Sequence, residues 1–116
     1  MENDASTMTV ADLIEETTRL RERFKTFERP PWTIETMVTE LMAEMGTLAD
    51  SVMISEGHRK VRPGDSVDLA DDIADILFMV ICIAQHYGVD VEKAYRGMLE
   101  TTHKKLGARE QESRRK

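Results

Sequence analysis

The sequence predicts a small all-α fold, and three observations support this class. Apolar residues recur at helical spacing in four separate stretches of the chain. Proline and glycine punctuate the segments between these stretches, and no convincing strand pattern is found. Aromatic residues make up only 5% of the 116 residues, whereas methionine occurs 8 times. A core of aliphatic side chains and methionine suits helix-on-helix packing better than a β-sandwich.

The first two helices are expected on either side of a proline-containing break. The first is expected at 10–27, with Thr9 as its N-cap. It cannot continue through 28–32, which contains two consecutive prolines. The second is expected from the N-cap Thr33 to about residue 56, where a glycine follows. Gly46 lies inside it, and a close approach of a neighbouring helix would explain this residue.

The third helix is expected from 66 or 67 to 87, and the fourth from 91 to 106, with Asp90 as its N-cap. The third is apolar all round between 76 and 84, so it should be the central helix. The termini, 1–6 and 107–116, are expected to be loose. The sequence thus predicts a single domain, 1–116, that folds as a four-helix bundle. We expect association with further copies of the chain to complete the packing of this bundle.

Composition and charge limit the partners. The net charge of −6 disfavours nucleic acid, whose phosphates are bound mainly by Lys and Arg. It leaves a nucleotide possible if a divalent cation neutralises the phosphates. The single cysteine, Cys82, is expected in the core and suits a reducing compartment. The longest apolar run is too short to cross a membrane and no signal-peptide core begins the chain, so we expect a cytoplasmic protein without a membrane partner.

Acidic residues fall in one stripe on each of two successive helices. Residues three or four apart share a helix face, and both stripes lie at the edge of the apolar face of their helix. Carboxylates that meet across a cleft repel one another unless a cation binds, and hard oxygen ligands suit Mg²⁺ or Mn²⁺. The second helix contributes Glu40, Glu44, Thr47 and Ser51, and the third contributes Asp68, Asp72 and Asp75.

A solvated acidic face is the alternative interpretation of these stripes. A helix N-terminus favours negative charge by about 0.3–1 kcal/mol per group, which explains part of the crowding at Asp68, Asp71 and Asp72. It explains Asp75 less well, because this residue lies in the third turn beside the apolar run.

Two short motifs resemble a known family. Residues 44–50 read Glu-Met-Gly-Thr-Leu-Ala-Asp, and residues 72–78 read Asp-Ile-Ala-Asp-Ile-Leu-Phe. They are similar to the E-E-x-x-E and E-x-x-D motifs of the MazG-like all-α nucleoside triphosphate pyrophosphohydrolases. Residues 87–94 are similar to the stretch before the last helix of that family. The resemblance covers roughly residues 30–106.

The resemblance implies an activity and a site. Proteins of this family bind Mg²⁺ through these acids and hydrolyse nucleoside or deoxynucleoside triphosphates to the monophosphate and pyrophosphate. By position, Glu44 matches the second acid of the first motif, and Asp72 and Asp75 match the acids of the second. The resemblance also implies dimers or pairs of dimers, so a homodimer or homotetramer is expected.

The chain departs from the family pattern at three positions. Ala43 and Thr47 stand where the first motif has glutamates, and Asp72 is one methylene shorter than the usual Glu. Phosphoryl hydrolysis needs charge neutralisation and an activated water, so these losses weaken the metal site. Glu40, one turn before Glu44, is the better candidate for an auxiliary ligand or base.

Four further residues are candidates for substrate binding. Arg59 and Lys60 lie in the basic loop between the second and third helices, from which they could reach substrate phosphates. The alternative interpretation is an ordinary polar loop. Lys104 lies near the end of the fourth helix, where a cation also complements the helix dipole. Trp32 follows two prolines, where it is suited either to stack on a base or to act as a hydrophobic staple.

Three functions remain open at this point. The first is a Mg²⁺- or Mn²⁺-dependent hydrolase of nucleoside triphosphates, with Glu44, Asp72 and Asp75 as metal ligands and Glu40 and Glu44 as catalytic groups. The second is a catalytically weak or inactive relative that binds nucleotide or a protein partner, which the missing glutamates at 43 and 47 favour. The third is a purely structural helical module, which predicts neither metal nor nucleotide binding.

Overall fold

A computed structural model describes residues 7–27 and 32–115. These residues form four helices and no strand: α1 (Val10–Phe24), α2 (Ile34–Ser55), α3 (Leu69–His86) and α4 (Val91–Arg115). The predicted all-α class with four helices is confirmed. The expectation of a loose segment at 1–6 lies outside the described residues.

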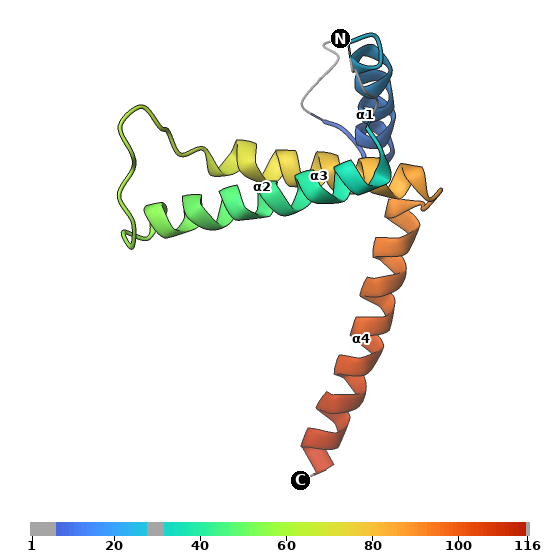
Figure 1. The fold of residues 1–116 in the computed structure, drawn as a ribbon. Helices are drawn as coiled ribbons and strands as arrows, with labels where there is room; N and C mark the ends of the chain where they lie inside the picture. Colours follow the sequence, from blue (N-terminus) through green and yellow to red (C-terminus); the bar gives the residue numbers. More distant parts are fainter. Residues whose placement is uncertain (1–6, 28–31, 116) are drawn as a thin grey trace.

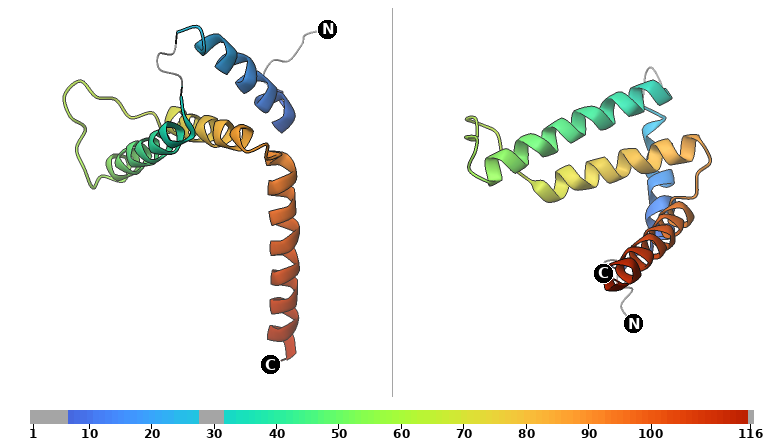
Figure 2. Two further views of the ribbon diagram at one scale, coloured as in Figure 1. Left: turned by 45° about the vertical axis from the view of Figure 1, so that its right-hand side comes forward. Right: turned by 90° about the horizontal axis from the view of Figure 1, so that it is seen from below.

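Helices α2 and α3 form an antiparallel hairpin, and the loop between them lies at one end of it (Figure 1). Helix α1 packs on α3 near the opposite end, so α3 contacts helices on two sides, as expected of the central helix. Helix α4 turns by 103° from α3 and projects away from the hairpin (Figure 2). The four helices therefore do not form a closed bundle within one chain.

The helices begin at residues whose side chains cap the first backbone N–H groups. Thr9 and Asp12 form a reciprocal capping box, with both hydrogen bonds near 3 Å. Thr33 and Asp90 accept from the backbone of the third residue beyond them, which confirms all three predicted caps. Asp68 caps α3 in the same way, so this helix begins at 69 and not at 66 or 67.

Each helix of the hairpin is followed by a glycine whose backbone angles lie in the left-handed region, which favours glycine. Gly57 has φ +79° after α2, and Gly88 has φ +65° after α3. At Gly88 the N–H donates to the carbonyl of Gln85 (3.2 Å), and the following Val89 N–H donates to Ala84 (2.9 Å). This pattern is a Schellman motif, and it satisfies carbonyls that would otherwise have no partner.

Two predicted helix ends are wrong. Helix α1 ends at Phe24, because the backbone tightens into a turn that includes a 2.8 Å hydrogen bond from Phe27 to Phe24. Helix α4 continues past the predicted end at 106 to Arg115. Gly107 costs only about 1 kcal/mol in a helix interior, strong helix formers follow it, and basic residues in the last turn complement the helix dipole.

The hydrophobic core lies along the line where α2 and α3 pack, which we call the α2–α3 seam. Met37, Met79 and the fully buried Cys82 form its centre, as predicted for this cysteine. Partly buried side chains pack against them: Ile34, Leu41, Phe78 and Ile83. The close approach expected at Gly46 is not found, because a Cβ there would have no neighbour within 4 Å in this chain.

Gln85 fixes α1 on α3. Its side-chain amide donates to the hydroxyl of Thr18 (2.8 Å) and accepts from Arg21 (2.9 Å). A polar side chain at the end of an apolar helix is thus satisfied by the helix that packs beside it.

The chain exposes far more surface than a compact monomer of its size. Its accessible area is 9837 Å², whereas a folded monomer of 13.3 kDa has about 6,500 Å². Its radius of gyration is 19.1 Å, against about 13 Å for a compact domain of this length. Met42 and Met45 of α2 and Ile73 of α3 are each more than half exposed.

No single helix in 7–27 or 32–115 is long and apolar enough to cross a membrane. Taken together, α3 and α4 are long and apolar enough, but they are bent by 103° relative to each other, and the criterion considers length and composition alone.

Replacement of Gly88 by alanine should destabilise the protein by about 1 kcal/mol, because an L-residue is strained in the left-handed region. Gly97→Ala is the matched control, since this glycine lies inside α4 with open space around it. The control should be neutral or stabilising by up to about 1 kcal/mol. Urea denaturation curves measure both changes, and an unchanged midpoint for Gly88→Ala would contradict the assignment.

Candidate functional site

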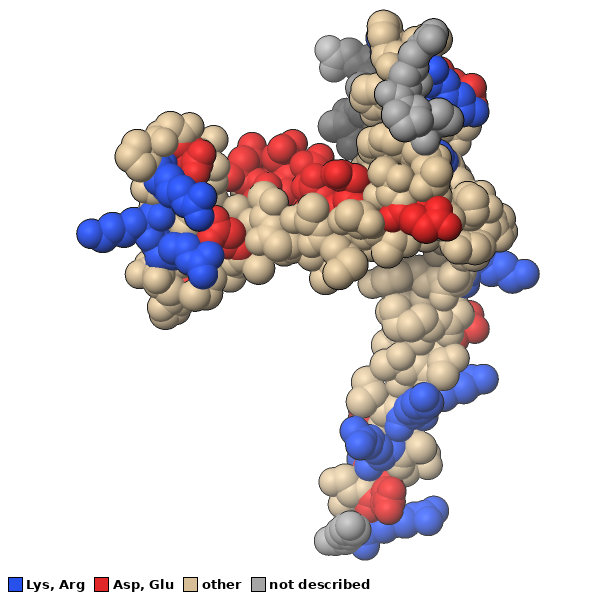
Figure 3. Space-filling model, in the orientation of Figure 1, with Lys and Arg blue, Asp and Glu red and all other residues tan. Residues whose placement is uncertain are grey.

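Carboxylates from α2 and α3 gather on one side of the α2–α3 seam (Figure 3). We call this side the acidic face; it carries Glu40 and Glu44 of α2 with Asp71 and Asp75 of α3. Helix α2 places Glu40 and Glu44 one turn apart, and the antiparallel α3 brings Asp75 alongside them in one pocket. The predicted convergence of the two acidic stripes is therefore seen for these three residues.

An open pocket of about 430 Å³ lies where the acidic face meets α1. Three of its lining residues are carboxylates, Glu40, Glu44 and Asp75, and the rest are mostly aromatic or aliphatic. The apolar side is formed by Leu20, Phe24, Trp32, Ala74, Phe78 and Met79. The pocket thus has one charged wall and one wall suited to a flat apolar group.

The acids of this face raise one another's pKa values. Partial burial raises the pKa of Glu44 above its ordinary 4.5, and the charges of Asp75 and Glu40 raise it further. The charge of Asp75 is also the main cause of the raised pKa of Asp71, followed by loss of water and the charge of Asp68. Negative charge on this face is therefore unfavourable to the fold when no cation is bound.

Asp72 lies in the seam itself and not among the residues that line the pocket. Its side chain is buried, and the Ser51 hydroxyl donates to its Oδ2 at 2.5 Å. A charge-assisted bond of this kind is strong and links α2 to α3. The charge of Asp72 also contributes to the raised pKa values of Glu44 and Asp71, so this buried residue influences the acidic face although it does not line the pocket.

Within the described residues, no three side chains of His, Cys, Asp or Glu are arranged to hold a metal ion. The chemistry of the donor set nevertheless fits a hard divalent cation, because the acidic side chains of the pocket, Glu40, Glu44 and Asp75, offer carboxylate oxygens. The raised pKa values of Glu44 and Asp71 are those expected of a cluster that lacks its counter-charge.

Of the predicted substrate-binding residues, Trp32 lines the pocket that also contains Glu40, Glu44 and Asp75, which we call the acidic pocket. Arg59 forms an ion pair with Asp50 near the end of α2, and Lys60 is exposed in the loop beside it. Lys104 is exposed on α4, which projects away from the acidic face (Figure 1). In one chain the three basic residues are therefore not brought to the pocket.

Sequence reasoning missed the contribution of α1 to the pocket. Leu20 and Phe24 reach it because α1 is fixed on α3 through Gln85. The sequence signal was available, since a glutamine that follows a long apolar run needs a polar partner from another element.

Comparison with known proteins agrees with this architecture. The MazG nucleotide pyrophosphohydrolase domain matches residues 32–112. The chain belongs to the MazG family. This match includes α2, α3 and most of α4, and therefore both helices of the acidic face. No curated protein sequence and no solved structure gives a significant match.

Membership of the MazG family indicates the kind of substrate and cofactor with which such a domain works. MazG pyrophosphohydrolases act on nucleotides and generally depend on a divalent metal. The residues at which this MazG chain lacks carboxylates, Ala43 and Thr47, are both exposed on α2. The Thr47 hydroxyl donates to the Ala43 carbonyl at 3.2 Å, and Thr47 lines a separate polar pocket with Asp50 and Ser51.

Neutralising Glu44 should stabilise the metal-free protein near neutral pH. The folded-state pKa of Glu44 lies above 4.5, so its ionised form opposes folding and this penalty fades as the pH falls toward 4.5. In the presence of a chelator, Glu44→Gln should therefore melt at a higher temperature than wild type at pH 7, and the difference should vanish below pH 4.5.

The control for this prediction is Glu100→Gln, which removes one charge from an exposed position of α4. It should leave the melting temperature nearly unchanged. A Glu44→Gln variant no more stable than wild type across this pH range would show that the acids of the face do not repel one another.

Proposed function

We propose that this protein hydrolyses nucleoside or deoxynucleoside triphosphates to the monophosphate and pyrophosphate, with Mg²⁺ or Mn²⁺ as cofactor. The observation that carries the proposal is the two-sided pocket at α1, α2 and α3. Its three carboxylates suit a cation that carries phosphates, and its aromatic side chains suit a nucleobase. Membership of the MazG family supports a nucleotide as the substrate.

The apolar wall orients the nucleotide. Trp32 is 39% exposed, so its ring is available to a base, while Phe24 and Phe78 complete the wall. A base held there directs the triphosphate along the charged wall formed by Glu40, Glu44 and Asp75. Apolar packing of the base also excludes water from one side of the substrate.

The carboxylates perform two tasks in this proposal. Glu44 and Asp75 would hold the cation from the pocket wall, and Asp72, whose Oδ2 accepts from the Ser51 hydroxyl in the seam, would turn its carboxylate toward the pocket to join them. Glu44 or Glu40 accepts the proton of the attacking water, which breaks the bond between the α- and β-phosphates and releases pyrophosphate.

The cation supplies neutralisation of the phosphate charge and a water of lowered pKa. The absence of carboxylates at Ala43 and Thr47 reduces the number of ligands available to it. A second candidate function follows from this observation, namely a catalytically weak or inactive relative that binds nucleotide or a protein partner. The two candidates differ in turnover and agree on nucleotide binding.

The proposal includes a homo-oligomer, either a homodimer or a homotetramer, located in the cytoplasm. The large exposed area of the single chain supports association. The single cysteine suits a reducing compartment. The net charge of −6 supports the absence of a nucleic-acid partner.

Turnover is the direct test. The wild type should release pyrophosphate and the monophosphate from at least one member of a panel of nucleoside and deoxynucleoside triphosphates, only when Mg²⁺ or Mn²⁺ is present. Glu44→Gln and Asp75→Asn should each lower kcat/KM by about 100-fold or more, because each removes a metal ligand or base.

Asp50→Asn is the matched control, since it also removes a carboxylate from α2 but lies outside the acidic pocket and pairs with Arg59. It should retain wild-type turnover. Nucleotide binding without turnover of any substrate would favour the inactive relative. Turnover that survives Glu44→Gln and Asp75→Asn would place the reaction elsewhere.

A further inference from the structure

Helix α1 contributes to the acidic pocket, although it lies outside the part of the chain that matches the MazG family. The match begins at residue 32, whereas α1 spans Val10–Phe24. Leu20 and Phe24 of this helix line the pocket together with Trp32. Family membership therefore does not account for the position of α1, and the contacts that fix it must be sought in the structure.

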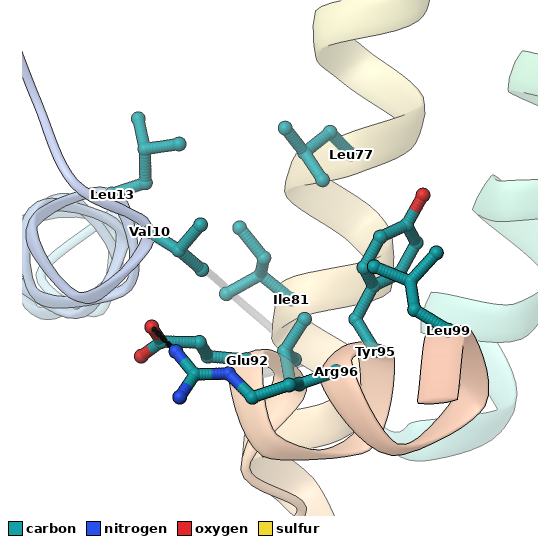
Figure 4. Close-up of a pocket in the computed structure, with 9 residues that line it drawn as sticks. Val10, Leu13, Leu77, Ile81, Glu92, Tyr95, Arg96 and Leu99 are labelled. Atoms are coloured by element: carbon teal, nitrogen blue, oxygen red, sulfur yellow. Dashed lines mark hydrogen bonds and ion pairs between the residues drawn. The ribbon is translucent and has the colours of Figure 1, made fainter. Parts of the chain in front are cut away.

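Apolar packing holds α1 only loosely on the rest of the chain. Val10, Leu13, Leu20 and Phe24 are each between 36% and 45% exposed. A pocket of about 350 Å³ lies between the start of α1, α3 and the start of α4, and it is lined by Val10 and Leu13 on one side and Ile81 on the other (Figure 4). Because the hydrophobic effect has no direction, burial of a few half-exposed side chains does not fix the rotation of a helix.

Hydrogen bonds to Gln85 of α3 supply this direction. The side-chain amide of Gln85 donates to the Thr18 hydroxyl (2.8 Å) and to the Ile14 carbonyl (3.4 Å), and its oxygen accepts from Arg21 (2.9 Å). The Thr18 hydroxyl also donates to the Ile14 carbonyl (3.1 Å), so these bonds form one connected set, which we call the Gln85 network. Its partners on α1 are three or four residues apart and share one helix face, so the network fixes both the rotation of α1 and its register along α3.

The Gln85 network lies next to the residues of α1 that reach the pocket. Arg21 follows Leu20 directly, and Phe24 lies one turn further, about 4.5 Å along the helix axis from Arg21. A rotation of α1 by one residue, about 100°, would carry Leu20 and Phe24 away from Trp32. The charged wall, in contrast, comes from α2 and α3, which the seam holds together without α1.

We propose that Gln85 is a positioning residue for the nucleobase, because its bonds to α1 hold the apolar wall of the pocket in place. Gln85 is not among the residues that line the acidic pocket, so it acts on the substrate only through α1. A nucleotide therefore gains affinity from the Gln85 network through its base, whereas a polyphosphate without a base gains none. The inference rests on the proposed function, since it divides that pocket into a base end that depends on α1 and a phosphate end that does not.

Two ligands that share the phosphate end test this division by isothermal titration calorimetry with Mg²⁺ present. The α,β-imido analogues of deoxynucleoside triphosphates resist hydrolysis and carry both base and phosphates, whereas inorganic tripolyphosphate carries the phosphates alone. Gln85→Ala should weaken binding of the best nucleotide analogue about tenfold, because stacking on the apolar wall is lost, and Arg21→Met should weaken it in the same direction. Both variants should bind tripolyphosphate within about twofold of wild type, because its partners are the cation and the charged wall.

Matched controls remove the same chemical groups from exposed positions. Gln111→Ala shortens a glutamine of α4, and Arg23→Met removes a guanidinium of α1 that lies outside the Gln85 network. Both should bind the two ligands as wild type does. The double variant of Gln85→Ala with Arg21→Met should bind the nucleotide analogue no more weakly than Gln85→Ala alone, because residues that act through one contact are not additive.

Fluorescence of Trp32 tests the position of α1 without metal or nucleotide. This residue is the single tryptophan of the chain, and it lines the pocket together with Leu20 and Phe24. Release of α1 from α3 therefore exposes its ring to a dissolved quencher. The acrylamide quenching constant should rise about 1.5-fold or more in Gln85→Ala and should equal that of wild type in Gln111→Ala.

Equal losses of affinity for the nucleotide analogue and for tripolyphosphate in Gln85→Ala would show a general structural role and overturn the proposal. Unchanged nucleotide binding or unchanged Trp32 quenching in a folded Gln85→Ala would also overturn it. Arg21→Met decides the same questions if Gln85→Ala fails to fold. Binding of neither ligand by wild type is a distinct result that contradicts the proposed function itself, whereas the other outcomes concern Gln85 alone.

Discussion

Packing of α2 against α3 is the constraint on which the rest of the structure depends. The seam is centred on Met37, Met79 and the buried Cys82, and a bond from Ser51 to Asp72 crosses it. Because every residue of a helix has a fixed angle to such a seam, packing divides the hairpin into two faces. The acidic residues fall on one and the exposed apolar residues on the other.

The acidic face is unfavourable to the isolated chain. Partial burial and then the charges of Asp75 and Glu40 raise the pKa of Glu44, and the charge of Asp75, loss of water and the charge of Asp68 raise the pKa of Asp71. A fold that gathers like charges in this way requires a compensating gain, which a bound cation and its nucleotide provide in the proposed function. The loss of carboxylates at 43 and 47 reduces the repulsion as well as the number of ligands.

The sequence predicted the elements better than their arrangement. Helical spacing located four helices, and Thr9, Thr33 and Asp90 marked their starts, because caps are local interactions. The ends of α1 and α4 were missed, since a final turn and a tolerated glycine depend on small energies. Helical angles correctly placed Glu44 beside Asp75, whereas the positions of α1 and α4 depend on contacts between distant residues that periodicity does not report.

The measurement that tests the central claim most directly is Mn²⁺ binding to the acidic face, followed by water proton relaxation without nucleotide. Wild type should enhance relaxation in a saturable manner that Mg²⁺ reverses, and the double variant Glu44→Gln with Asp75→Asn should lose the enhancement. Equal enhancement by wild type and the double variant, or none by wild type, would contradict the claim that these carboxylates converge to hold a cation.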